Sequence, residues 1–266
     1  MLFDLSSWAL IIVVVIVMFG ATGIGIAIGR SLRDRKSGLR EPLGVVQAAL
    51  VGLVALLLAF GLSMAVDRYE TRRAAVVLEA NAIGTTYLRA QTLAEPERSE
   101  SISLLKQYGD ARITLSEAVP DSSDFNAASD TSIEIQNQLW ALAGRALDDA
   151  PVDSAPRLYV ETLNEMIDAH TTRVAALDNR IPAPVLWVQL GAAALALGVL
   201  GMLLAAHERG VLMALLAAGL VSIMLLVVFD LDRPNRGLIE VPDSAIVAVR
   251  ASMDEPPAAA APTGSP

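Results

Sequence analysis

Four long apolar runs without a charged residue limit what this chain can fold into more than any other feature. They cover residues 8–29, 43–66, 183–206 and 211–229, and each contains 19 to 24 residues. A helix rises about 1.5 Å per residue, so roughly 20 residues cross the ~30 Å hydrocarbon core of a bilayer. The first run is no signal peptide, because no basic residue precedes it and a second span follows. The sequence therefore predicts four transmembrane helices.

The segment between the second and third runs has a different composition. Residues 67–182 carry 19 acidic and 11 basic side chains, which indicates a domain in water. No helix breaker follows Val66, so the second transmembrane helix should continue to about Leu93. Further helices are predicted near 98–118, 126–149 and 156–179. The expected fold class is an all-α membrane protein with four transmembrane helices and a helical extramembrane domain inserted between helices two and three.

This division gives five predicted parts along the chain. They are a first transmembrane hairpin, 1–66, with a basic linker at 30–42; the acidic helical domain, 67–182, begun by the extension of helix two; a second transmembrane hairpin, 183–229; a post-membrane turn and short helix, 230–254; and a disordered tail, 255–266.

Composition excludes several classes of function. A net charge of −9 argues against a nucleic-acid partner, which requires a basic surface. The chain has no cysteine and only two histidines, so it can form neither a disulfide nor a thiolate or His-rich metal centre. No nucleophile, metalloprotease or Cys–His motif occurs, so we expect no enzyme activity and no cofactor.

Small residues at fourth positions predict close helix packing. Gly25 and Gly29 form a GxxxG motif in the first transmembrane helix, and Ala21 extends it. The second helix carries a similar series, Ala48, Gly52, Ala59 and Ser63. Outside the membrane, His170 belongs to a helical apolar stripe with Tyr159, Leu163, Met166 and Val174, so it is expected to be a core or edge histidine rather than a ligand. Trp140 is likewise expected in the core.

A polar face on the extension of helix two is a candidate site. Asn81, Thr85 and Arg89 are spaced i, i+4 and i+8, so they share one side of the helix. This face could line a hydrated path or bind an anion, or it could form a hydrogen-bonded seam between helices.

A second candidate is the charge cluster after the fourth apolar run. Asp230 and Asp232 lie at a helix C-terminus, where the helix dipole disfavours negative charge unless nearby cations compensate it. Arg233 and Arg236 follow them around Pro234. Since helices two and four leave the membrane on the same side, we expect the aspartates to pair with the basic cluster that follows helix two. That cluster consists of Arg68, Arg72 and Arg73.

Three segments resemble the bestrophin-like membrane proteins of bacteria and plants. They are GLSMAVDRYETRR, LEANAIGTTYLRAQ and FDLDRPNRGLIEVP. The resemblance implies a distant relation to bestrophins, which are pentameric, mostly anion-selective ion channels with a helical cytosolic domain. By this analogy Asp230 and Asp232 could join a cation-binding turn, and the metal, if any, is unknown. Leu231 separates the two aspartates, and the neighbouring arginines can balance their negative charge. Calcium gating is therefore not expected.

These features are consistent with two functions. The first is an oligomeric ion channel, which passes anions if it follows most bestrophins. The second is a non-conducting membrane scaffold or sensor whose helical domain binds a protein partner. Lys and Arg counts beside the spans, six on one side and seven on the other, do not set the orientation. The resemblance places the protein in the cell (inner) membrane, with 67–182 and the C-terminus in the cytosol.

Overall fold

The computed structural model describes residues 6–31, 40–205 and 210–255, and only the backbone for 40–43. The linker residues 32–39 and the tail from 256 onward lie outside this description. Within the described residues all regular secondary structure is helical, which confirms the predicted fold class. The helices are α1 (Ser7–Ser31), α2 (Arg40–Ala90), α3 (Glu97–Glu117), α4 (Ser123–Asp149), α5 (Ser154–Asp178), α6 (Ala183–Leu204), α7 (Gly210–Leu231) and α8 (Ser244–Ser252).

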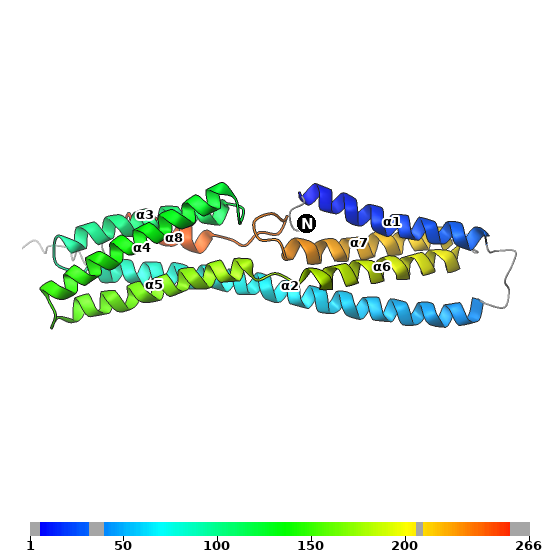
Figure 1. Ribbon diagram of the computed structural model, residues 1–266, viewed down its shortest axis with the longest axis horizontal. Coiled ribbons are helices and arrows are strands. Elements are labelled where there is room, and N and C mark those ends of the chain that lie inside the picture. Colours follow the sequence, from blue (N-terminus) through cyan, green and yellow to red (C-terminus); the bar gives the residue numbers. More distant parts are fainter. Residues whose placement is uncertain (1–5, 32–39, 206–209, 256–266) are drawn as a thin grey trace, which may run out of the picture. The chain divides into compact units, whose positions relative to one another are not determined.

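These helices form two compact units, shown in Figure 1. The membrane unit comprises residues 1–69 and 180–240 and contains α1, α6, α7 and the first part of α2. The helical unit comprises residues 70–179 and 241–266 and contains the rest of α2 with α3, α4, α5 and α8.

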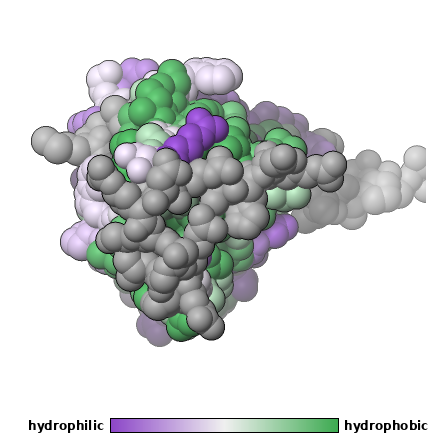
Figure 2. Space-filling view, turned by 90° about the vertical axis from the view of Figure 1, so that its right-hand side faces the viewer, coloured by the Kyte–Doolittle hydropathy of each residue, from purple (hydrophilic) through white to green (hydrophobic). Residues whose placement is uncertain are grey.

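The membrane unit contains the apolar stretches that were predicted to span a bilayer. Four helices in the described residues are long and apolar enough to do so. Many of their large apolar side chains point outward, including Ile16 (64% exposed), Phe60 (60%) and Leu220 (65%). Figure 2 shows hydrophobic residues on the surface around the end of this unit where α1 ends and α2 begins. An apolar exterior on apolar helices is the surface that a bilayer requires.

Glycines let α1 and α6 approach at backbone distance. A Cβ atom on Gly25 would collide with the carbonyl group of Gly198, and one on Gly29 with the carbonyl group of Met202. From the opposite side, a Cβ on Gly201 would lie 2.6 Å from the carbonyl oxygen of Thr22. The predicted packing face of α1 is confirmed, and its partner is α6. The small residues of α2 behave differently: Ala48, Gly52, Ala59 and Ser63 are all exposed and meet no other described helix of this chain closely enough to be buried.

Two glutamines link α2 to α6 inside the apolar region. Gln47 of α2 donates from Nε2 to the carbonyl oxygen of Ala196 at 3.2 Å, and Gln189 of α6 donates to that of Leu57 at 3.0 Å. Gly61 leaves room for Gln189, whose amide a Cβ there would strike. Both glutamines are buried, so the bonds form where water does not compete.

The helical unit packs around a core of large side chains. Ile83 of α2, Leu105 and Tyr108 of α3, Leu139 of α4 and Met166 of α5 are all fully buried in it. The α5 stripe with Tyr159, Leu163, Met166 and His170 is buried as predicted. The expectation for Trp140 was wrong, because 45% of its surface is exposed. It follows Leu139 by one residue, about 100° around the helix, and therefore points away from the core.

The C-terminal helix α8 completes the helical unit. Ile246 is fully buried beside Val76 and Ala80 of α2. Arg250 binds the Asp110 carboxylate of α3, with Nε 2.7 Å from Oδ1. A nine-residue helix is marginal alone, so these contacts hold it in its helical form.

The close α1–α6 contact makes a testable prediction. Replacing Gly25 with alanine should lower stability by about 1–3 kcal/mol, the usual effect of overpacking, because the new methyl group meets backbone that cannot rotate away. The matched control is Gly23→Ala in the same helix, where a Cβ would have no atom within 4 Å. Thermal unfolding in detergent measures both variants. Equal melting temperatures would contradict the predicted role of Gly25.

Candidate functional site

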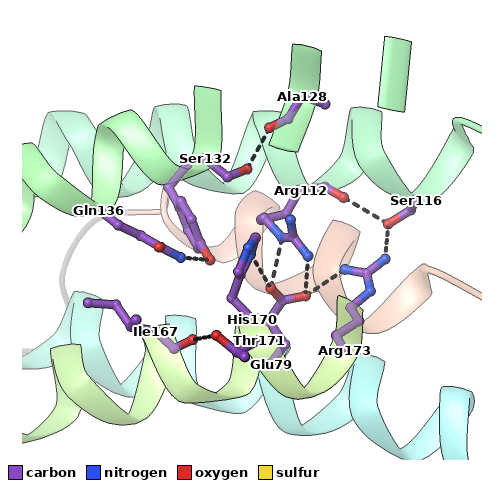
Figure 3. Close-up of polar contacts among 11 residues, drawn as sticks. Glu79, Arg112, Ser116, Ala128, Ser132, Gln136, Ile167, His170, Thr171 and Arg173 are labelled. Atoms are coloured by element: carbon purple, nitrogen blue, oxygen red, sulfur yellow. Dashed lines mark hydrogen bonds and ion pairs between the residues drawn. The ribbon is translucent and has the colours of Figure 1, made fainter. Parts of the chain in front are cut away.

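A buried carboxylate lies at the centre of the helical unit. Glu79 of α2 has no exposed side-chain surface, and two arginines surround it (Figure 3). Arg112 of α3 approaches with Nε 2.7 Å from Oε1 and Nη2 3.2 Å from Oε2. Arg173 of α5 approaches with Nη1 2.6 Å from Oε2. One carboxylate thus joins three helices that are distant in the sequence.

Other polar groups complete this Glu79 cluster. The second terminal nitrogen of Arg173 donates to the Ser116 hydroxyl at 2.6 Å, and that hydroxyl donates to the carbonyl oxygen of Arg112 at 2.8 Å. His170 lies one turn before Arg173 on α5, with Nδ1 3.8 Å from the Glu79 carboxylate. The Arg112 guanidinium stands 6.0 Å from the centre of the Tyr108 ring, which is the outer limit for a cation–π contact.

The electrostatics of the Glu79 cluster fix the protonation of its members. Burial raises the pKa of Glu79, but the charges of Arg112 and Arg173 outweigh burial and hold that pKa below its ordinary value. Burial lowers the pKa of His170 to about 4, and the two arginines act in the same direction against the opposing charge of Glu79. At neutral pH Glu79 is therefore charged and His170 is neutral.

The predicted polar face of α2 opens onto a surface groove. Asn81 and Thr85 line a cavity of about 450 Å³ together with Glu165, Asp168 and Thr172 of α5. Arg89 is exposed further along α2 and does not line this cavity. The structure thus brings Asn81 and Thr85 beside two carboxylates. This α2–α5 groove is acidic, although the sequence had suggested a path with an arginine.

The turn after α7 is tied by its aspartates to backbone amides. Both oxygens of Asp230 lie 2.8 Å from the N–H of Leu238, and one also accepts from Ile239 at 2.8 Å. Asp232 is buried and accepts from the N–H of Ile181, before α6, at 2.8 Å. Gly237 is required here because a Cβ would lie 2.9 Å from the Asp230 carboxyl carbon. The Asp230 carboxylate thus accepts hydrogen bonds from backbone amides. The described residues hold no group of three or more His, Asp or Glu that could bind a metal ion.

The basic residues after helix two contact backbone carbonyl groups and a surface carboxylate. Arg72 is buried and donates to the carbonyl oxygens of Ala176 (3.3 Å) and Asn179 (3.1 Å) at the end of α5. Arg73 lies 3.6 Å from Glu70 on the surface, and Arg68 donates to the carbonyl oxygen of Met64 at 3.5 Å. Arg233 is buried and Arg236 is half-buried in the turn after α7. The ion pairs predicted between Asp230 or Asp232 and the basic cluster after helix two stay a prediction.

Sequence reasoning missed the Glu79 cluster, although a signal for it existed. Glu79 lies within the apolar stripe of Val76, Ala80 and Ile83, so the helix turns it toward the core. Its partners come from α3 and α5, more than 30 and 90 residues away in the sequence. Only the packed domain shows that these charges meet.

The fold and these sites define an integral membrane protein with a helical domain whose core holds a charged cluster. A family model, the Bestrophin-like domain, matches residues 11–246. The chain therefore belongs to the bestrophin-like family, as the three segments that resemble it had indicated. No curated protein matches the chain.

Solved structures share this fold. One is a bacterial Bestrophin homolog from Klebsiella pneumoniae, with a TM-score of 0.71, 11% identity, and coverage of 90% of this chain and 97% of that one. A single-residue variant of that homolog gives a TM-score of 0.70 at 12% identity with the same coverage. A structure described only as a membrane protein gives 0.70 at 13% identity, again with 90% and 97% coverage.

Replacing Glu79 with glutamine tests how much this carboxylate contributes to stability. The change leaves two guanidinium groups in the core without their counter-charge, so we expect a loss of about 3–5 kcal/mol in unfolding free energy. The control is Glu70→Gln, which removes a surface pair with 3.6 Å between its charged atoms and should change little. Denaturant unfolding of both variants gives the comparison. A Glu79→Gln protein as stable as the control would contradict this role.

The histidine in the cluster predicts acid sensitivity. The pKa of His170 is about 4 in the folded protein and about 6.5 when unfolded, so between these values only the unfolded chain binds the proton. Stability that is present above about pH 6.5 should be lost progressively as pH falls toward 4, by at most about 3 kcal/mol. A His170→Gln variant should lose less than the unaltered protein between about pH 7 and pH 5. The measurement is the melting temperature of both proteins as a function of pH. An equal fall of the two melting temperatures with pH would contradict this role of His170.

Proposed function

We propose that this protein is an ion channel that acts as a homo-oligomer in the cell (inner) membrane. Membership of the bestrophin-like family supports this proposal, because bestrophins are known as channels. The apolar spans contain no ionisable residue, which argues against a coupled transporter or pump, because these usually carry such residues within the membrane. A pentamer, and a cytosolic position for 67–182 and the C-terminus, follow from the analogy with bestrophins. Labelling of a cysteine placed at Ser122, in a chain without native cysteine, tests that orientation.

The observation that carries the proposal is the α2–α5 groove. Its polar wall of Asn81 and Thr85 lies on the helix whose other end is the second membrane span. Glu165 and Asp168 give the groove two negative charges and bring no positive side chain to its lining. A path along this wall would raise the local concentration of cations and repel anions. We therefore infer that cations, rather than the anions of most bestrophins, are the conducted ions.

The outward face of α2 suits an oligomer around such a path. Ala48, Gly52, Ala59 and Ser63 form an exposed series of small residues on its membrane segment. Small residues permit close approach of helices in a bilayer, so a second copy of the chain could pack here or leave a narrow passage. No side chain on this series is larger than the hydroxymethyl group of serine.

Ion flux through purified protein in liposomes tests the function. We expect cation flux, and a double variant, Glu165→Gln with Asp168→Asn, should reduce the cation-to-anion permeability ratio several-fold because it removes the wall charge. The control is Asp149→Asn, which removes an exposed carboxylate at the end of α4 and should leave the ratio unchanged. Absence of flux under changes of voltage, pH and calcium would rule out the channel.

One observation favours the alternative of a non-conducting scaffold. Ile133 and Trp140 lie two helical turns apart on α4 and are 46% and 45% exposed. Tryptophan is a common anchor residue for a protein partner. A protein that conducts no ions, but loses a partner when Trp140 is replaced with alanine, would have this function.

A further inference from the structure

The Glu79 cluster is one negative charge short. Arg112 and Arg173 each carry a positive charge, Glu79 carries the one negative charge, and His170 is neutral at neutral pH. Arg112 is fully buried and Arg173 is 4% exposed, so water does not screen the excess. Buried charges in proteins are paired, because an uncompensated one is costly to remove from water.

The guanidinium groups also have hydrogen-bonding capacity that the chain does not use. Arg112 directs Nε and Nη2 at Glu79, but its buried Nη1 has no hydrogen-bond partner among the described residues. Arg173 uses its two terminal nitrogens on Glu79 and Ser116, and its buried Nε likewise has no partner there. Both unused donors belong to groups within 3.2 Å of one carboxylate.

Loss of a proton does not relieve this excess. Burial lowers the pKa of Arg173, but arginine is so strong a base that it stays protonated in proteins at neutral pH. Tyr108 cannot supply the missing negative charge, because burial raises the pKa of its hydroxyl group. Asp110, the nearest acidic neighbour of Arg112 in the sequence, is already bound to Arg250.

We propose that the Glu79 cluster binds one monovalent anion of halide size, such as chloride, at the unused N–H group of Arg112 or of Arg173. One negative charge restores neutrality, whereas a divalent anion would overshoot it. The enclosure of both arginines favours a small spherical ion over a polyatomic one. A bound water molecule would satisfy the N–H groups but not the charge. This site lies in the core of the helical unit, and it does not depend on ion conduction.

Chloride dependence of stability tests the site on the full-length protein in detergent. Sodium chloride replaces sodium gluconate at constant ionic strength, and the melting temperature should rise saturably by about 3 °C as a site fills. Arg173→Gln removes the excess charge and should abolish this rise, whereas Arg173→Lys keeps the charge and should retain it. The control is Arg157→Gln, which removes an exposed guanidinium bound to the carbonyl oxygen of Pro151 and should show the full rise.

Bromide locates the anion without any substitution. Crystals of the unaltered protein grown in sodium bromide should show an anomalous peak within hydrogen-bond distance of the Arg112 or the Arg173 guanidinium group. Peaks on the surface alone would mean an adventitious ion only and would overturn the proposal. A melting temperature that is independent of chloride, or an unchanged chloride response in Arg173→Gln, would overturn it as well.

Discussion

The helical unit depends on the burial of Glu79. Arg112 of α3 and Arg173 of α5 both bind its carboxylate, so α2 cannot rotate without breaking contacts to both. Nearby, the Thr86 hydroxyl contributes a second link to α5 by donating to the carbonyl oxygen of Thr162 at 2.9 Å. These bonds set which side of α2 faces outward. They therefore place Asn81 and Thr85 beside Glu165 and Asp168 in the α2–α5 groove.

The membrane unit uses a different principle, because apolar helices gain no hydrophobic stabilisation from each other in lipid. Its helices are held together by close van der Waals packing and by a few hydrogen bonds. Gly25 and Gly201 bring the backbones of α1 and α6 together, and Gln47 and Gln189 bind carbonyl groups across α2 and α6. The turn after α7 is closed in a similar way, since Asp230 and Asp232 hold backbone amides of Leu238 and Ile181.

Several elements could be predicted because their signals are local. A run of about 20 apolar residues is sufficient to predict a membrane helix, and the GxxxG motif of α1 was sufficient to predict a packing face. The stripe from Tyr159 to His170 identified the buried side of α5. Trp140 failed the same reasoning, because apolar neighbours in the sequence do not show toward which side of a helix a residue points.

The sequence alone determined that this chain has four transmembrane helices and an acidic helical domain, since length, hydropathy and periodicity are properties of single segments. It also carried the resemblance that the family match confirmed. Only the tertiary structure decided that Glu79 meets two arginines and that two carboxylates of α5 line the groove with Asn81 and Thr85. Charges act through space over a few ångströms, and the chain brings these groups together from helices up to 94 residues apart.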